Sequence, residues 1–210
     1  MKNLLNVIQK HIRLNIIIYI ITILALTIGI VMGTYTVKAL SDSQKVELIN
    51  YLEGFFQILE SQKFDSYQLF FQTFINQLKL LIPIWILGAT VIGMPIIILI
   101  LGFRGFILGF TIGFIIDEFA FNGILFIILS ILPHNLFYLP GLIGIGVMSI
   151  SFSLFLLKSK LKKEKVYNRK AQFWTYTIVI LMISIFLLLG SIIEGYITPI
   201  FMKTLSPNFI

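Results

Sequence analysis

Residues 132–140 read LPHNLFYLP, and this stretch decides how the chain can fold. It is as apolar as a membrane span, yet it holds two prolines and a His-Asn pair. Proline has no backbone N–H and clashes with the preceding helical turn, so a helix should bend or end near Pro133 and Pro140. Broken helices occur at membrane depth only where protein or a water-filled cavity covers the freed backbone groups. The stretch is therefore predicted to lie at the centre of a helical membrane protein, covered by other spans.

The composition supports an integral membrane protein. Of 210 residues, 58% are hydrophobic and only 12% are charged, and the mean hydropathy is +1.00. Soluble domains are about 45–50% apolar and about 25% charged. The absence of cysteine excludes disulfides, thiolate metal sites and thiol catalysis. The two histidines, His11 and His134, are expected at different depths, so no metal or cofactor site is predicted.

Five spans are expected from the apolar runs, at residues 14–37, 79–102, 106–121, within 122–157, and 173–193. Residues 102–105, which include Arg104, read as a tight cytoplasmic turn between the second and third spans. With these bounds, cytoplasmic segments hold 11 basic residues and 1 acidic residue, and exterior segments hold 5 basic and 8 acidic ones. Positive charge stays in the cytoplasm, so we predict a cytoplasmic N-terminus and an extracytoplasmic C-terminus.

The segment 122–157 is too long for one straight span, and two full spans would place the lysine-rich connector 158–172 outside. A broken or re-entrant helix resolves this conflict. We therefore predict an all-α polytopic membrane protein of about five transmembrane helices. It forms a single integral membrane domain over residues 1–210 and includes an extracytoplasmic amphipathic helical segment at 38–78.

The segment 38–78 is predicted to form two helices, the second running into the next span. Ser41 and Gln44 have the spacing of a capping box, and Asp65 and Gln68 repeat it. Apolar residues then recur at helical intervals. The aromatic faces are suited either to the membrane surface and neighbouring spans or to a docking surface for a partner, and both readings stay open.

Gly105, Gly109 and Gly113 fall four residues apart, which leaves one helix face smooth enough for another backbone to approach closely. The row predicts a helix contact. It is compatible with a contact inside the chain and equally with a homodimer.

The polar residues in or near the spans form no recognisable catalytic set; they are Arg104, Asp117, Glu118, His134, Asn135 and Glu194. The sequence has no phosphate-binding loop, zinc-protease motif or nucleophile elbow. Asp117 and Glu118 are adjacent and point about 100° apart on a helix, as at an interfacial helix end. His134 could bind an ion or relay a proton, but bonding to carbonyls left free by the prolines, with help from Asn135, is the favoured interpretation.

The chain resembles the stage II sporulation protein M family of endospore-forming bacteria along its whole length. The features that carry the resemblance are, in order, a basic N-terminus before the first span and the motifs at residues 43–45, 85–88, 91–95, 105–114, 132–136 with Pro140, and 191–199. His134 stands where related sequences tend to have glutamine, which cannot titrate, so a proton relay becomes less favoured. Arg104 stands where they tend to have lysine.

This resemblance implies a non-enzymatic scaffold in the mother-cell membrane at the sporulation septum. The scaffold would localise and assemble the peptidoglycan-degrading engulfment complex, with stage II sporulation proteins P and D as partners and no nucleic acid. The candidate partner-binding residues on the wall-facing side are Phe55, Phe56, Phe70, Phe71, Asp117 and Glu194. The rival interpretation is a channel or transporter that uses the broken helix around His134.

Overall fold

A computed structural model of the protein describes residues 9–61, 66–161 and 169–205. All regular structure in these ranges is helical, as the sequence predicts. In chain order the elements are α2 (Ile16–Lys38), α3 (Asp42–Ser61), α4 (Ser66–Gly88), α5 (Gly93–Phe126), the π-helical turn η1 (Ile127–Ile131), α6 (Leu132–Leu161), α7 (Arg169–Ile192), the π-helical turn η2 (Ile193–Ile197) and α8 (Thr198–Leu205).

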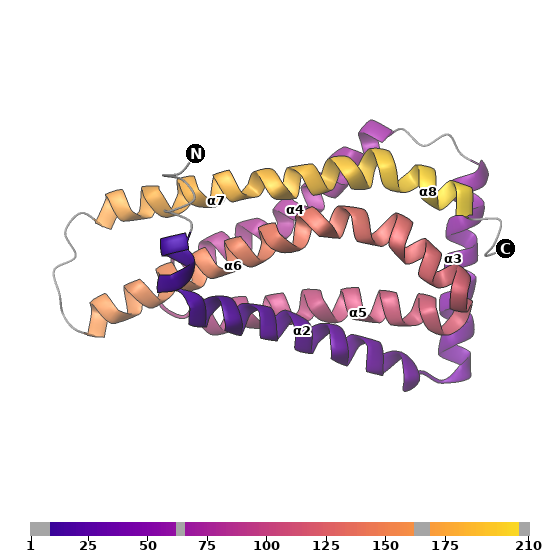
Figure 1. Cartoon of the computed structure of the whole chain (residues 1–210), viewed down its shortest axis with the longest axis horizontal. Helices are drawn as coiled ribbons and strands as arrows, with labels where there is room; N and C mark the ends of the chain where they lie inside the picture. The colour runs from indigo at the N-terminus through magenta and orange to yellow at the C-terminus, as the bar shows by residue number, and fades with distance from the viewer. Residues whose placement is uncertain (1–8, 62–65, 162–168, 206–210) are drawn as a thin grey trace.

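Four helical segments are long and apolar enough to cross a membrane: Ile16–Lys38, Ser66–Gly88, Gly93–Leu161 and Lys170–Thr204. The third of them folds back on itself at Ala120, whose backbone is non-helical with φ 44° and ψ −117°. As a result α5 and α6 run antiparallel along the bundle axis (Figure 1). With α2, α4 and α7 they make five passes in the described part of the chain. The all-α, polytopic class that the sequence predicts is confirmed.

The two ends of the bundle differ in charge. We call one the basic end, because it carries the start of α2, the end of α6 and the start of α7, with Lys10, Arg13, Lys158, Lys160 and Lys170. We call the other the α3 end, because α3 and α8 lie there (Figure 1). Residues 162–168 of the basic connector lie outside the described residues. The side of the membrane that each end faces stays a prediction from the charge distribution.

The sequence-based bounds of the second and third spans were wrong. The second pass is α4, which begins at Ser66 and contains Pro83 in its interior, and the reversal occurs at residues 89–92. Ser153 of α6 fixes this turn, because its hydroxyl donates to the Thr90 carbonyl at 2.8 Å and accepts from the Met94 N–H at 3.2 Å. The freed backbone groups of the turn are thus satisfied by a neighbouring helix.

Residues 102–105 therefore lie inside α5 and not in a cytoplasmic turn. Arg104 follows Gly93 by 11 residues, which at about 1.5 Å per residue places it roughly 16 Å along the helix. The hydrocarbon core of a bilayer is about 30 Å thick, so Arg104 lies near mid-depth of the bundle. The basic end remains strongly positive without Arg104. At mid-depth this residue instead contributes a positive charge to the interior of the bundle.

The segment 122–157 forms one continuous pass that is not re-entrant. Its break takes the form of η1, where the Leu132 N–H bonds the Ile127 carbonyl with π-helical spacing. Pro133 is the second residue of α6, and Pro140 lies inside that helix. The helix tolerates both prolines because it is bent and packed among neighbouring passes, as Figure 1 shows for its first half.

The glycine row of α5 packs against α2 within the chain. A Cβ added at Gly105 or Gly109 would collide with the carbonyl oxygens of Leu26 or Ile30 on α2. The contact is reciprocal, because Gly29 and Gly33 of α2 each lie against the backbone of α5. Because these glycines are occupied within the chain, they give no support to a homodimer. The homodimer stays a prediction.

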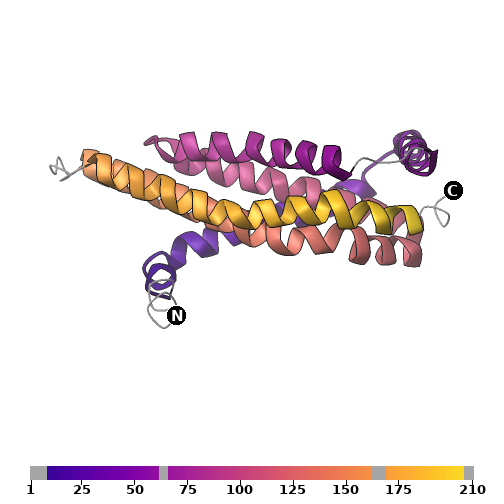
Figure 2. The ribbon, with the colours of Figure 1, turned by 90° about the horizontal axis from the view of Figure 1, so that it is seen from above.

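The amphipathic helix α3 lies across the α3 end, roughly perpendicular to the bundle, and is seen nearly end-on in Figure 2. Ser41 and Gln44 form the capping box that their spacing predicts, with N–H contacts of 3.0 and 3.4 Å. Leu52 packs against the apolar cluster formed by α5, η1 and α8 at this end. Lys45 forms ion pairs with Asp117 and Glu118 beside the Ala120 reversal, so α3 is tied to the bundle at two points.

Replacing Gly109 with alanine should destabilise the bundle, because the added methyl group cannot fit against α2. We expect a loss of about 1–3 kcal/mol, the usual cost of overpacking, measured as a lower midpoint of thermal unfolding of the detergent-purified protein. Gly54→Ala on α3 is the matched control, since nothing lies within 4 Å of its added Cβ. Equal midpoints for the two variants would contradict this packing.

Candidate functional site

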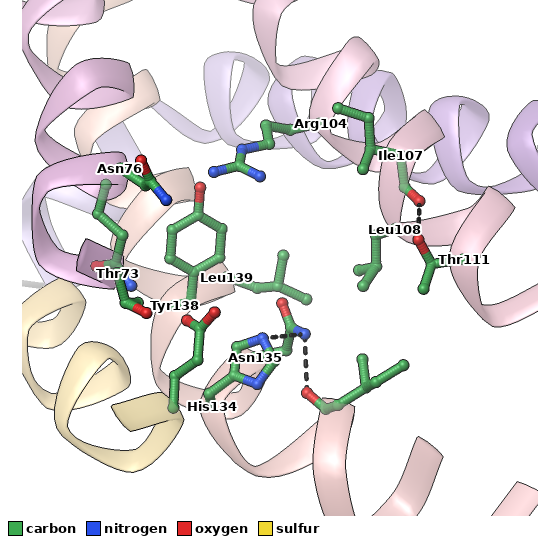
Figure 3. A pocket seen from close by; sticks show the side chains of 13 residues that line it. Thr73, Asn76, Arg104, Ile107, Leu108, Thr111, His134, Asn135, Tyr138 and Leu139 are labelled. Atoms are coloured by element: carbon green, nitrogen blue, oxygen red, sulfur yellow. Dashed lines mark hydrogen bonds between the residues drawn. The ribbon is translucent and has the colours of Figure 1, made fainter. Parts of the chain in front are cut away.

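Helices α4, α5 and α6 and the turn η2 enclose a polar cavity inside the bundle (Figure 3). Its volume is about 350 Å³. The lining residues are Thr73, Asn76, Gln77, Arg104, Ile107, Leu108, Thr111, Ile131, His134, Asn135, Tyr138, Leu139 and Glu194. Polar groups from four separate elements thus meet where the surrounding helices are otherwise apolar.

His134 and Asn135 bond to the turn that Pro133 distorts. The Asn135 amide donates to the Ile131 carbonyl at 2.8 Å, and His134 Nδ1 lies 3.3 Å from the Ser130 carbonyl oxygen. The Asn135 amide nitrogen also lies 3.0 Å from His134 Nε2. Both side chains thus bond carbonyls of η1 four residues earlier, while they also line the cavity. Bonding to the carbonyls that the prolines leave free stays a prediction.

Arg104 brings a positive charge to the same cavity. Its guanidinium carbon lies 5.3 Å from the centroid of the Tyr138 ring, within the range of a cation–π contact. Figure 3 shows the guanidinium of Arg104 and the hydroxyl of Tyr138 turned toward each other, with the Asn76 amide beside them. The turn η2 contributes Glu194 to the lining, near enough for Arg104 to act on it electrostatically. Among the described residues, no ion pair joins these two charges.

Two further polar atoms at the cavity lack hydrogen-bond partners in the part of the chain that the structure describes. They are Oε1 of Gln77 and the hydroxyl oxygen of Tyr138, on side chains with exposed fractions of 5% and 7%. The Arg104 guanidinium lies close to this hydroxyl but without the geometry of a hydrogen bond. An unsatisfied buried polar group costs about 1–3 kcal/mol. The cavity has room for water or a ligand to supply the missing bonds.

An apolar groove of about 550 Å³ runs beside the cavity along α4 and α5. It shares Asn76, Arg104 and Ile107 with the cavity and is otherwise lined by Lys79, Leu80, Pro83, Ile96, Leu99, Ile100 and Phe103. Leu99 and Phe103 are 71% and 64% exposed, so the groove opens toward the lipid side of the bundle. Lys79 lies on its edge and donates to the Asn76 side chain at 3.4 Å.

The six candidate partner-binding residues do not form one surface. The side chains of Phe55 and Phe56 lie outside the described residues. Phe70 packs against Gly195 and stacks on Phe74, whereas Phe71 is 50% exposed. Asp117 and Glu194 are both engaged in the bundle, the first with Lys45 and the second at the cavity.

Lys45 is the best-defined charged contact at the α3 end. Its hydrogen bond to Asp117, reinforced by Glu118, raises the pKa of the Lys45 ammonium above its ordinary value. Because the Lys45 and Asp117 side chains are 27% and 37% exposed, solvent screens the pair, which contributes orientation more than stability. The two acids act at a helix end, as their adjacent positions suggest.

Sequence reasoning missed the association of Arg104, Gln77 and Tyr138 with the His134 site. The sequence pattern predicts a turn at Arg104 and an exterior helix at Gln77. The glycine row offered a signal, because Ile97 and Leu101 continue its four-residue spacing backward through residues 102–105 without a break. That continuity is typical of an uninterrupted helix.

A cavity that admits water should make a thiol on its wall reactive. We expect Thr73→Cys to react with a charged, water-soluble thiol reagent when the protein is in liposomes, because the reactive thiolate forms only where water reaches it. Ile178→Cys on α7, which is 53% exposed but faces away from the cavity, is the control and should stay unmodified in liposomes. The chain has no cysteine of its own to interfere. A Thr73→Cys thiol as unreactive in liposomes as that of the control would show that the cavity is dry.

A family model described as stage II sporulation protein M matches residues 22–199 of the chain. No curated protein and no solved structure gives a significant match. The matched region contains most of α2 and every cavity-lining residue, from Thr73 to Glu194. The chain is therefore a sporulation-related membrane protein that belongs to the stage II sporulation protein M family.

Proposed function

We propose that this protein is a non-enzymatic membrane scaffold that assembles the peptidoglycan-degrading engulfment complex. The observation that carries the proposal is the position of α3, which is fixed across one end of the bundle with apolar side chains directed outward. A rigid, partly apolar surface outside the spans is suited to holding soluble or membrane-anchored partners.

The outward surface of α3 is defined by its contacts. Leu52 and Lys45 hold the helix to the bundle, whereas Val46 and Tyr51 are 53% and 75% exposed. Exposed tyrosine is common in interfaces because it offers a large contact area and a hydrogen-bonding hydroxyl. Partner contact is therefore assigned to the exposed flanks of α3 that carry Val46 and Tyr51.

An exposed aromatic pair lies at the start of α4. Tyr67 and Phe71 are 61% and 50% exposed, and their rings stack with centroids 6.3 Å apart. Their place at the end of a membrane pass is also suited to the lipid interface. Phe70 is excluded from this surface because its ring contacts Tyr196 at a centroid distance of 6.2 Å.

The partners proposed are stage II sporulation proteins P and D, as the family resemblance implies. The α3 end then faces the cell wall, and the basic end faces the cytoplasm, consistent with the charge distribution. The protein would act in the mother-cell membrane at the sporulation septum. Its contribution is placement of the hydrolases, and their own active sites carry out the cleavage.

A second candidate function is passage of a solute or ion, because the cavity around His134 holds several polar groups at membrane depth. Purified protein in liposomes that passes small ions faster than empty liposomes would favour it. A His134→Ala variant should abolish that passage if the imidazole takes part. Absence of passage leaves the scaffold as the supported function.

The scaffold proposal is tested by the combined variant Tyr51→Ala and Phe71→Ala. We expect it to insert normally but to lose co-purification with proteins P and D, and to lose their recruitment to the septum. Trp174→Ala, which removes a 63% exposed aromatic residue near the basic end, is the matched control and should retain both. Full recruitment by the double variant would rule out this surface.

A further inference from the structure

One positive and one negative side chain face the cavity, an arrangement suited to a zwitterionic ligand. Arg104 and Glu194 line the same space without forming an ion pair in the described part of the chain. Opposite charges in a medium of low dielectric constant attract strongly, so separation across a cavity requires other partners for each. Water is one such partner, and a zwitterionic group is another.

The cavity and the groove are ordered along the bundle axis. Glu194 lies nearest the α3 end, because the adjacent Gly195 packs on Phe70 in the first turns of α4. Arg104 lies deeper, and the apolar groove continues from it toward Ile96, three residues from the start of α5. A negative group, then a positive group, then an apolar channel therefore follow one another inward from the α3 end.

We propose that the cavity and groove together bind one phospholipid with a phosphoethanolamine headgroup, which enters laterally from the bilayer where the groove opens at Leu99 and Phe103. The phosphate pairs with Arg104, whose guanidinium fork matches phosphate oxygens, and Lys79 adds a second cation at the edge. The ammonium pairs with Glu194. One acyl chain lies in the groove between α4 and α5.

The unpartnered polar atoms of the site fit the same headgroup. Oε1 of Gln77 can accept a hydrogen bond from the ammonium, and the Tyr138 hydroxyl can donate one to the phosphate. The side groove is what favours a lipid over a free zwitterion. Its wall is apolar and opens laterally at Leu99 and Phe103, so only a ligand with a hydrocarbon chain would fill it.

The test is native mass spectrometry of the full chain in detergent, titrated with phosphatidylethanolamine and phosphatidylglycerol that carry identical acyl chains. Wild type should prefer phosphatidylethanolamine by on the order of tenfold, as expected for one charged hydrogen bond. Glu194→Gln should remove this preference by weakening phosphatidylethanolamine alone. Arg104→Gln should weaken both lipids. Lys38→Gln and Glu47→Gln, which remove charges at the α3 end outside the cavity, should change neither.

Two more variants keep the test decisive if Arg104→Gln does not fold. Arg104→Lys retains the charge and should retain the preference for phosphatidylethanolamine. Ile96→Trp fills the groove from a position already 38% exposed, and it should weaken both lipids without affecting the charges. Free phosphoethanolamine should bind much more weakly than the lipid.

Three results would overturn the proposal. Equal retention of both lipids by wild type and every variant would mean that the cavity holds only a water-bridged charge pair. Binding of free phosphoethanolamine as tight as that of the lipid would identify a soluble zwitterion instead. A preference for phosphatidylglycerol in wild type would show that Glu194 takes no part. Tyr51→Ala should leave lipid binding unchanged, so this test is independent of the scaffold surface.

Discussion

The whole structure depends on one requirement, that polar side chains and irregular backbone at membrane depth be covered by protein. An arginine at the centre of a membrane helix costs about 3 kcal/mol or more. Here Arg104 turns toward Tyr138 and the cavity, and the irregular turn η1 is bonded by His134 and Asn135. Helices α4, α5 and α6 surround these groups, so the polar centre dictates which helix faces turn inward.

Close packing and a few polar contacts hold the remaining passes around this centre. Glycines let the backbones of α2 and α5 come into direct contact. The Thr34 hydroxyl donates a hydrogen bond to the Gly109 carbonyl at 3.1 Å. Nearer the basic end, Tyr176 donates to the Trp85 carbonyl at 2.8 Å and lies 3.0 Å from the Ser149 hydroxyl. Lipid provides no hydrophobic drive between helices, so such contacts determine which helices associate. A rigid bundle is the condition for presenting α3 at a fixed position.

The sequence was sufficient for the membrane class, the number of passes, the α3 capping box and a helix contact at the glycine row. Each of these follows from local pattern. It was insufficient for the register of the second and third passes, because the apolar run from Leu80 to Ile116 contains two candidate turns. Arg104 between glycines looked like the turn, whereas the true reversal at residues 89–92 has no charged residue. It is determined instead by Ser153, which is distant in sequence.

The cavity could not be predicted, since it depends on that register. If Arg104 lay in a turn, it would be far from His134 and Glu194. Each of the three residues could then be explained by its own sequence neighbours. Only the antiparallel arrangement of α4, α5 and α6 with η2 brings the three side chains to one space. The family match agrees with the overall class but names no residue of the cavity.

The most direct test of this account is the location of the turn between α4 and α5. Single cysteines at Thr90 and Phe103, placed in a chain that has none, can be treated with a membrane-impermeant thiol reagent from each side of oriented vesicles. We expect Thr90→Cys to react from the side of the basic end and Phe103→Cys to react from neither side. Reaction of Phe103→Cys with protection of Thr90→Cys would place Arg104 in a surface turn and contradict the intramembrane cavity.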